Sequence, residues 1–454
     1  MMESKEIKKW MWDLATAMQG ALYSKDVGFS MVRLVFLKYA TDNCLGAMSM
    51  DEMQSYMQLQ RTFSARDIEG GPNSVWPVLL TIDKNYNLNG LLRASMSDYE
   101  RELFGLDDNR NFRNSASLNA FKRIIDALSY ANLTEDAEPF IKGKMIVNEL
   151  IEMLKGQGDS AKFPYWSKKE VGEIAKNILS VSENETFLDF ASGVGSTTIT
   201  IVGDTKCKIK CNEVNAKVAT ISSMLYIMQG YRDFVVESFD SFAPYIEEYA
   251  EIPEDEKADK IFVDSPMGLK VKESPLKESS LIGLCQAVNK LKENGMAILT
   301  VAPSVLSGAG KSQEIRKLLI ESGYIQSVIA LPLTCPNSTI TTNMVVVSKK
   351  KNDGIMFVNA CVDEFKQYIL SSSKVRGGTT ISEEGIELLS KIVNDNIEVK
   401  SISKFIAFTD VDSKSYDLSP LFHITQTIEV EDITVKEIDV ELNVLYEKLK
   451  NLIK

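Results

Sequence analysis

The stretch FLDFASGVGS, residues 187–196, decides the fold class because it combines an apolar strand, a glycine-bearing turn and the start of a helix. Asp189 ends the apolar run and adds a hydrogen-bond acceptor at the strand end. Gly193 and Gly195 allow a ligand to approach the backbone closely, and the following helix offers N–H groups to an anion. The third glycine of a dinucleotide fingerprint is missing, because Ser196 and a threonine follow Gly195. The turn is therefore either a ligand cradle or a structural glycine turn.

Strands and helices alternate on both sides of this turn. Short apolar runs occur at residues 186–190, 208–212, 260–263, 296–301, 325–331 and 344–347. Longer helical segments lie between them, for example at residues 169–179, 216–229 and 312–322. This alternation predicts a mostly parallel α/β sheet. In such sheets ligands bind at the carboxyl ends of the strands, so the loops after strands are the candidate sites.

Two of those loops carry acidic residues. Glu213 ends the run KIKCNE, 24 residues after Asp189, and an acid at the tip of the second strand can accept hydrogen bonds from two ribose hydroxyls. The pair therefore indicates a nucleoside cofactor without saying which one. The loop DSPMG, residues 264–268, follows a further strand and is either a rigid active-site loop or a simple turn. Cys207 and Cys211 lie on one face of the intervening strand, where we expect a structural role.

The segment before the sheet is helical. One apolar stripe repeats at steps of three and four and consists of Ile7, Trp10, Met11, Leu14, Met18 and Leu22. A second run, residues 29–39, is apolar nearly all round and predicts a buried helix.

The chain returns to helices and irregular connections from about residue 364 and closes with a helix signal. TVKE, residues 434–437, is a capping box. Behind it an a/d seam of a little over two heptads is formed by Ile438, Leu442, Leu445, Leu449 and Leu452. This terminal helix either packs on its own domain or pairs with a partner's coiled coil.

The charge balance and the histidine and cysteine content exclude or disfavour several classes of protein. Among 454 residues, 51 Lys and Arg stand against 63 Asp and Glu, which gives a net charge of -12. That balance argues against a free-standing basic DNA clamp, but not against DNA handled through a partner chain. His423 is the single histidine and is expected on the surface or in packing, and nothing supports a metal site. Scattered cysteines and the lack of an 18-residue apolar run or a signal peptide predict a soluble, cytoplasmic protein without a membrane segment.

The order of these motifs resembles the modification (M) subunit of type I restriction–modification systems, a family of S-adenosylmethionine-dependent DNA adenine N6-methyltransferases. VRLVFLKY, residues 32–39, resembles the family's "LFLKY" helix, and YWSKKEV, residues 165–171, resembles its "FYTPREV" segment, which folds over the cofactor. Residues 189–196 stand where the "DPACGSGG" cofactor loop would be, and DSPMG stands in place of the "NPPF-G" catalytic loop. Three further stretches continue in register, at residues 291–303, 327–332 and 416–420.

The resemblance implies an α/β, Rossmann-like methyltransferase domain at residues 156–365. An N-terminal helical domain, residues 1–155, would precede it, and a C-terminal segment, residues 366–454, would end in the partner-docking helix. The implied cofactor-binding residues for S-adenosylmethionine are Tyr165, Trp166, Ser167, Asp189, Gly193, Gly195, Ser196, Glu213 and Asp240. The implied catalytic residues are Asp264, Ser265, Pro266 and Met267.

The departures from the family concentrate in the catalytic loop. Ser265 replaces the first proline, which loosens the backbone whose carbonyl must point inward, and Met267 replaces the aromatic residue that stacks on the flipped adenine. Lys168 and Ser192 are milder departures near the cofactor. The rival to an active DNA methyltransferase is therefore a degenerate scaffold that binds cofactor, DNA or both without transferring methyl groups.

The resemblance also implies partners. DNA would be handled through a complex with a DNA specificity subunit, and a restriction subunit or a second M chain are further candidates. A methyltransferase that acts on a small molecule or a protein is a second rival function. A nucleotide-dependent dehydrogenase is a third, and the missing third glycine disfavours it.

Overall fold

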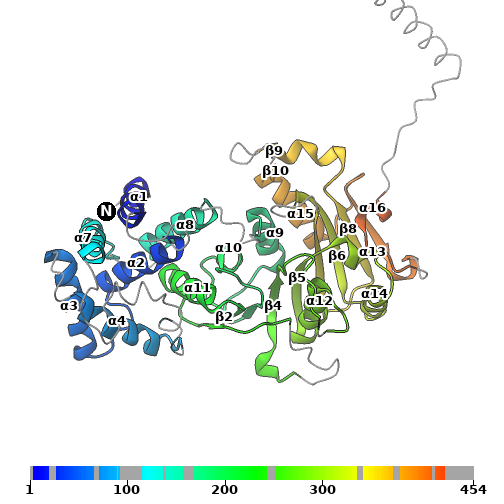
Figure 1. Cartoon of the computed structure of the whole chain (residues 1–454). Helices are drawn as coiled ribbons and strands as arrows, with labels where there is room; N and C mark the ends of the chain where they lie inside the picture. Colours follow the sequence, from blue (N-terminus) through cyan, green and yellow to red (C-terminus); the bar gives the residue numbers. More distant parts are fainter. Residues whose placement is uncertain are drawn as a thin grey trace, which may run out of the picture.

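The computed structural model describes residues 4–19, 27–65, 71–88, 90, 92, 115–135, 140–156, 167–242, 252–272, 274–334, 341–371, 379–411 and 415–424. Leu22, Tyr165, Trp166 and the expected C-terminal helix lie outside these residues. Helices gather at one end of the molecule, and a twisted sheet with helices on both faces occupies the rest (Figure 1). No helix in the described part of the chain is long and apolar enough to cross a membrane.

The N-terminal part is helical, as predicted. Its described helices of at least 15 residues are α1 (Ser4–Gln19), α2 (Val27–Asp42), α3 (Met50–Ala65), α4 (Gly71–Asn85), α7 (Ser115–Ser129) and α8 (Ile141–Gly156). The apolar stripe of α1 is buried, with Ile7, Met11, Leu14 and Met18 each 0% exposed. Helix α2 is buried almost all round, which confirms the prediction drawn from its apolar run.

A nine-stranded sheet forms the centre of the molecule. Its strands are β1 (Thr186–Asp189), β2 (Lys208–Asn212), β3 (Phe234–Glu237), β4 (Ala258–Val263), β5 (Leu291–Val301), β6 (Ile325–Thr334), β7 (Thr341–Ser348), β8 (Gly354–Asn359) and β11 (Ser403–Ala407). The spatial order is β11-β8-β6-β7-β5-β4-β1-β2-β3. Strand β7 runs antiparallel to β5 and β6, and β11 antiparallel to β8, whereas the other neighbours are parallel. The expectation of a mostly parallel sheet is confirmed.

Helices cover both faces of this sheet. They are α9 (Lys169–Leu179), α10 (Ser196–Val202), α11 (Ala216–Gln229), α12 (Ser279–Lys290), α13 (Pro303–Ser307), α14 (Lys311–Glu321), α15 (Glu383–Asp395) and the short α16 (Pro420–His423). Successive strand residues enter different cores: Phe187 joins the core shared with the N-terminal helices and α9 to α11, and Leu188 joins the core under α12 to α14. Both faces of the sheet are therefore buried, as parallel sheets require.

The segment after residue 364 contains more strand than the sequence indicated. Strand β11 joins the far edge of the main sheet, and β9 (Ile369–Ser371) pairs with β10 (Thr379–Ile381). Strand β11 has little apolar signal because it is an edge strand that begins with Ser403 and the exposed Lys404. Strand β8, with all six residues buried, was not predicted although its residues are mostly apolar. The proposed boundary at residue 365 remains a prediction, but it cuts through elements that share one sheet.

A buried arginine holds the YDLSP stretch against the sheet domain. Arg316 is 1% exposed, and its guanidinium donates to the carbonyls of Val305 (2.9 Å), Gly308 (2.8 Å), Ser415 (3.1 Å) and Tyr416 (2.6 Å). Because these carbonyls come from α13, the loop after it and the C-terminal segment, one side chain ties the three together.

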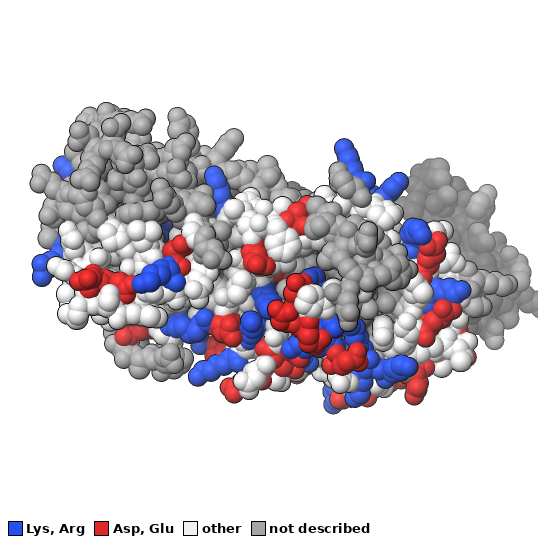
Figure 2. Space-filling view, turned by 90° about the horizontal axis from the view of Figure 1, so that it is seen from below, with Lys and Arg blue, Asp and Glu red and all other residues white. Residues whose placement is uncertain are grey.

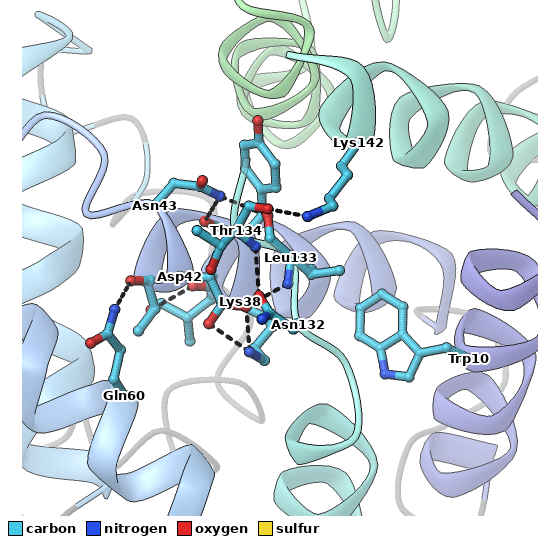
Figure 3. A network of polar contacts seen from close by, with 12 residues as sticks. Trp10, Lys38, Asp42, Asn43, Gln60, Asn132, Leu133, Thr134 and Lys142 are labelled. Atoms are coloured by element: carbon cyan, nitrogen blue, oxygen red, sulfur yellow. Dashed lines mark hydrogen bonds and ion pairs between the residues drawn. The ribbon is translucent and has the colours of Figure 1, made fainter. Parts of the chain in front are cut away.

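A polar network inside the helical domain fixes the end of α2 (Figure 3). Lys38 and Asp42 form an ion pair at 2.5 Å, with side chains 7% and 10% exposed. The Asp42 carboxylate also accepts from the Leu133 N–H at 2.8 Å. The Asn43 amide donates to the carbonyls of Tyr39 (2.8 Å) and Leu133 (3.0 Å). The stretch around Leu133 is thus bound to the end of α2.

Glu135 extends this network from α2 to the start of α8. Its carboxylate accepts from Tyr39 Oη (3.0 Å) and from the first N–H groups of α8 at Lys142 (3.2 Å) and Gly143 (2.6 Å). At Gly143 helix α8 lies so close to α11 that a Cβ atom would sit 2.0 Å from the Met228 carbonyl oxygen. The helical domain and the sheet domain therefore meet in a tightly packed seam between α8 and α11.

Candidate functional site

Three acidic residues converge at the carboxyl edge of the sheet. Strands β4, β1 and β2 are parallel neighbours in that order, and Asp189 pairs in register with Phe262 of β4 and Cys211 of β2. Asp189, Glu213 and Asp264 therefore lie at the ends of adjacent strands. The position agrees with the rule that parallel α/β sheets bind ligands at this edge.

Asp189 binds the glycine turn and the helix that follows it through its carboxylate. It is 2% exposed, and its carboxylate accepts from the Ala191 N–H at 3.1 Å and from Thr198 Oγ1 at 2.8 Å. Burial raises the pKa of Asp189 to about 7, and the charges of Asp264 and Glu213 act in the same direction. Since Asp189 is buried and its oxygens bind the turn and helix α10, whereas Glu213 and Asp264 are half-buried, we assign Asp189 to holding the loop in shape.

The two glycines of the turn serve different purposes. Both have left-handed φ angles, +54° at Gly193 and +82° at Gly195. A Cβ on Gly195 would lie 2.4 Å from Tyr226 Oη, so this glycine lets the loop rest on α11. A Cβ on Gly193 would meet no atom of the described residues within 4 Å, so the backbone there faces open space among them. The open position is where the loop can admit a ligand.

Glu213 ties the second loop to the first. Its carboxylate accepts from the Gly193 N–H at 3.0 Å and from the Asn215 N–H at 2.8 Å. Burial raises the pKa of this half-buried carboxyl group. The acid predicted to bind a ribose is thus held beside the open face of Gly193.

The third strand contributes a short polar turn. Asp240 is exposed and accepts from the Phe242 N–H at 2.9 Å. Phe242 packs on Phe190 of the glycine turn, with ring centroids 6.2 Å apart. Ser241 is 7% exposed, and its buried hydroxyl finds no hydrogen-bond partner among the described residues. A buried hydroxyl without a hydrogen-bond partner calls for an explanation, and a bound ligand would supply one.

These features fit S-adenosylmethionine. The open backbone at Gly193, the carboxylate of Glu213 and the unpartnered Ser241 hydroxyl match a ligand that brings a ribose and polar ring atoms. Ser196 begins α10, which places helix N–H groups next to the same turn.

Asp264 is held by hydroxyl groups from two other elements. Ser167, just before α9, donates to Asp264 Oδ2, and Thr300 of β5 donates to Oδ1. Burial raises the pKa of Asp264, and these two hydrogen bonds oppose the rise because they favour the carboxylate. Ser167 was predicted as a cofactor contact, which stays a prediction, and the structure shows its hydroxyl bound to the candidate catalytic acid.

The rest of the DSPMG loop is fastened to the start of α12. The hydroxyl of Ser265, which is 2% exposed, lies 3.2 Å from the hydroxyl of Ser280. The Pro266 carbonyl accepts from Ser279 Oγ at 2.9 Å and from the Leu269 N–H at 3.2 Å. We expected the lost proline to loosen this loop, whereas the serine in its place gains an anchor of its own.

Sequence reasoning missed four polar residues of this site: Thr198, Ser279, Ser280 and Thr300. Thr300 had a usable signal, because it is a lone polar residue in the apolar stretch AILTVA of β5. The two serines had none, because serines are ordinary at the start of a helix.

The remaining chemical candidates lie elsewhere or are structural. His423 stacks on Phe357 with centroids 4.0 Å apart, and its Nε2 lies 2.7 Å from the Asp417 carbonyl, which fits the expected packing role. Cys207 and Cys211 are buried at 8% and 1% exposure. Within the described residues no group of three or more His, Cys, Asp or Glu side chains is placed to hold a metal ion.

The amino-acid sequence is similar to those of known proteins. The family described as N-6 DNA Methylase matches residues 149–432. A curated relative, the type I restriction enzyme MpnII methylase subunit of Mycoplasma pneumoniae, is 24% identical over 182 residues, which cover 39% of this chain. The matched stretch spans only 32% of that relative's length.

Solved structures extend the similarity to nearly the whole chain. The type I restriction-modification system methyltransferase subunit from Streptococcus thermophilus superposes with a TM-score of 0.68 at 15% identity, covering 92% of this chain and 99% of that one. A chain from a structure of type I R-M complex assembly and conformational transition gives a TM-score of 0.64 at 13% identity, covering 100% and 97%. At these identities the likeness establishes the fold, and it confirms the predicted α/β methyltransferase class.

Proposed function

The chain belongs to the N-6 DNA methylase family, and we propose that it transfers a methyl group from S-adenosylmethionine to the exocyclic amine of adenine in DNA. The family match confirms the resemblance drawn from the sequence motifs. One observation carries the proposal. The glycine turn with its open position at Gly193 lies at the same edge of the sheet as Asp264, whose carboxylate accepts hydrogen bonds from two hydroxyl groups.

The cofactor residues have distinct tasks in this proposal. Glu213 would accept from ribose hydroxyls, and the Asp240 turn with the Ser241 hydroxyl would face the adenine ring. Gly193 leaves space for the ligand against the backbone. Asp189 and Gly195 shape the turn, and Ser196 starts the helix behind it. When bound, the cofactor supplies an electrophilic methyl group on a positively charged sulfur.

The amine is the nucleophile, so the protein's task is to hold and orient it. Its nitrogen forms the new N–C bond while the C–S bond breaks, a neutral thioether leaves, and the nitrogen then loses one proton. We assign Asp264 to accept a hydrogen bond from the amine. Because the Pro266 carbonyl is already shared between Ser279 and Leu269, we assign the second acceptor to the Ser265 carbonyl. Positioning and charge stabilisation supply the rate, since this amine needs no strong base.

Met267 would cover the face of the flipped base. A thioether packs on a base, but it gives up a stacking surface worth about 1–3 kcal/mol per base in single-strand binders. We therefore propose that target capture relies more on the loop's fixed acceptors than on stacking. The half-buried position of Met267 agrees with a wall of the pocket.

Recognition of the DNA sequence would come from a separate specificity subunit. The chain carries a net charge of -12, which suits a catalytic subunit that meets DNA through a complex. A restriction subunit or a second M chain are further proposed partners. The helix proposed for docking lies outside the described residues.

Calorimetric titration with S-adenosylmethionine tests the cofactor site. In Gly193→Trp the indole would fill the open space, and we expect binding to be lost. Gly310→Trp is the matched control, because Gly310 also has a positive φ of +69° and a Cβ there would meet no atom of the described residues within 4 Å. Loss of binding in both variants, or in neither, would contradict the assignment of the cofactor to the Asp189–Glu213 turn.

A second candidate function is the cofactor-binding scaffold, favoured by the serine and methionine in the DSPMG loop. Methylation of DNA in the presence of the specificity subunit separates the two. We expect methylation by the natural chain and more by Ser265→Pro with Met267→Phe. No methylation by either, with cofactor binding intact, would establish the scaffold.

A further inference from the structure

We propose that a second ligand site, specific for phosphate groups, lies at the opposite edge of the sheet from the proposed reaction site. A cavity of about 630 Å³ opens there, between the start of α8 and the amino ends of β1, β2 and β3. Its charged lining consists of Lys144, Lys206, Lys208, Arg232, Asp204 and Asp233. We call it the amino-edge groove.

The amino-edge groove is separate from the cofactor turn. Lys208 is the first residue of β2, whereas Glu213 follows its last residue. The length of the strand therefore stands between the two sites, with about 3.3 Å per residue. None of the proposed cofactor or catalytic residues that the structure describes lines the groove.

Positive charge in the groove exceeds negative charge. Of the four basic residues, Lys144 is paired with Asp204 at 2.5 Å. Lys206 and Lys208 are exposed and form no ion pair within the described part of the chain. Lys206 lies in the turn just before β2 and Lys208 is the first residue of that strand, and both line the groove. Burial lowers the pKa of the next alternate residue, Lys210, and the charge of Lys208 lowers it further.

Arg232 is held in place before any ligand arrives. Its guanidinium lies over the Phe140 ring, 4.7 Å from the centroid, and 5.8 Å from the centroid of Tyr86. It also donates to the Tyr231 carbonyl at 3.2 Å. A stacked guanidinium keeps its remaining donors in a fixed plane, which is the geometry that suits phosphate oxygens.

The walls of the groove are rigid because they follow the seam between the two domains. Gly143 places α8 against the Met228 carbonyl, and a Cβ on Gly230 would lie 2.9 Å from the Phe140 ring. Phe140 and Lys144 come from the helical side, whereas Lys206 and Arg232 come from the sheet side. A ligand would meet both sides at once without rearranging them.

Several exposed basic side chains along one groove suit a ligand with repeated negative charges, and we take a nucleic-acid backbone as the source of the phosphates. The exposed Lys206, Lys208 and Arg232 indicate a groove open along the surface rather than a closed pocket. On the face seen in Figure 2, basic and acidic side chains are mixed across the middle of the molecule. Because this face has no large patch of one charge, we expect a polyanion to be attracted by individual clusters of basic residues. The choice of a nucleic acid rests on the proposed function, whereas the phosphate chemistry does not.

Fluorescence anisotropy with the full chain and a labelled DNA duplex tests the site at several salt concentrations. In Lys206→Gln with Lys208→Gln we expect weaker binding and a slope of log K against log salt smaller by about 2, one for each lost phosphate contact. Lys400→Gln with Lys404→Gln is the matched control, because it removes the same charge from exposed lysines at β11, the far edge of the sheet. Competition by a nucleoside triphosphate and by inorganic phosphate distinguishes a polymer from a free phosphate ligand.

Three outcomes decide the proposal. A loss confined to the groove variant supports it, and stronger competition by triphosphate than by unlabelled duplex would reassign the same phosphate site to a free nucleotide. Equal changes in both variants, or no duplex or nucleotide binding at all, would overturn it. S-adenosylmethionine titration of the groove variant should be unchanged, so a failure of the methyl-transfer proposal would show in that titration and not in the salt slope.

Discussion

The two loops at the carboxyl edge are held by different means. The Asp189–Ser196 turn depends on backbone groups: the N–H groups of Ala191 and Gly193 donate to Asp189 and Glu213. The DSPMG loop depends on side-chain hydroxyls that come from the start of α9, from β5 and from α12. The first loop is thus held mainly through its own backbone N–H groups, and the second by side chains of other elements. Substitutions should affect folding and cofactor binding in the first, and methyl transfer in the second.

The largest expected effect is at Gly195. In Gly195→Ala the new Cβ would collide with Tyr226, and a non-glycine residue at a φ of +82° adds backbone strain. We expect the free energy of unfolding to fall by about 4 kcal/mol and cofactor binding to be lost. Denaturant unfolding and calorimetry measure both. Gly310→Ala shares the positive φ but has open space, so an equal loss there would show that strain alone is responsible.

Asp189 should make stability depend on pH. Its folded pKa of about 7 lies above the ordinary 3.8, so the stabilising contribution is fully present below pH 3.8 and is lost as pH rises through 7. We expect this residue to cost roughly 3 kcal/mol of stability between pH 4 and pH 7. Unfolding curves of the natural chain and of Asp189→Asn, compared across that range, give its share as a difference in slope. Parallel pH profiles would show that Asp189 does not titrate there.

Removing a hydroxyl from Asp264 should slow methyl transfer and spare the cofactor. Thr300→Val deletes one hydrogen bond to a carboxylate, worth about 1.5–3 kcal/mol, so we expect methylation to fall roughly 10- to 100-fold. The lost bond had favoured the charged form, so the pKa of Asp264 should rise and the acidic limb of the rate profile should move to higher pH. Thr300→Ser keeps the hydroxyl and should restore most activity. A matching loss of cofactor affinity in Thr300→Val would remove the distinction between the two loops.

The smallest effect is expected where α12 fastens the DSPMG loop. Ser280→Ala removes the partner of the Ser265 hydroxyl, a neutral hydrogen bond worth about 1 kcal/mol. We expect methylation to fall about fivefold, because the loop would lose one of its anchors. Ser280→Thr tests for recovery, and Ser265→Pro in the Ser280→Ala background should compensate by stiffening the backbone itself. No change in Ser280→Ala would mean that Ser279 and the Pro266 carbonyl hold the loop alone.

Some features of this protein were determined by the sequence itself. Periodicity predicted the buried face of α1, and apolar runs predicted the buried helix α2 and most strands of a mainly parallel sheet. Because parallel strands end at a common edge, the same runs also placed Asp189, Glu213 and Asp264 together. The glycine turn could be identified from the sequence because a left-handed φ or a close approach of the backbone favours glycine at that position.

Only the tertiary structure decided what surrounds those residues. The sequence could not show that Ser167 and Thr300 brace Asp264, that Ser280 anchors a loop that lost its proline, or that Arg232 lies across the seam from Phe140. The physical reason is that a hydroxyl or a cation has no preferred sequence spacing from its partner. Periodicity reports which face of an element is buried, whereas a hydrogen bond between elements depends on how those faces are finally packed.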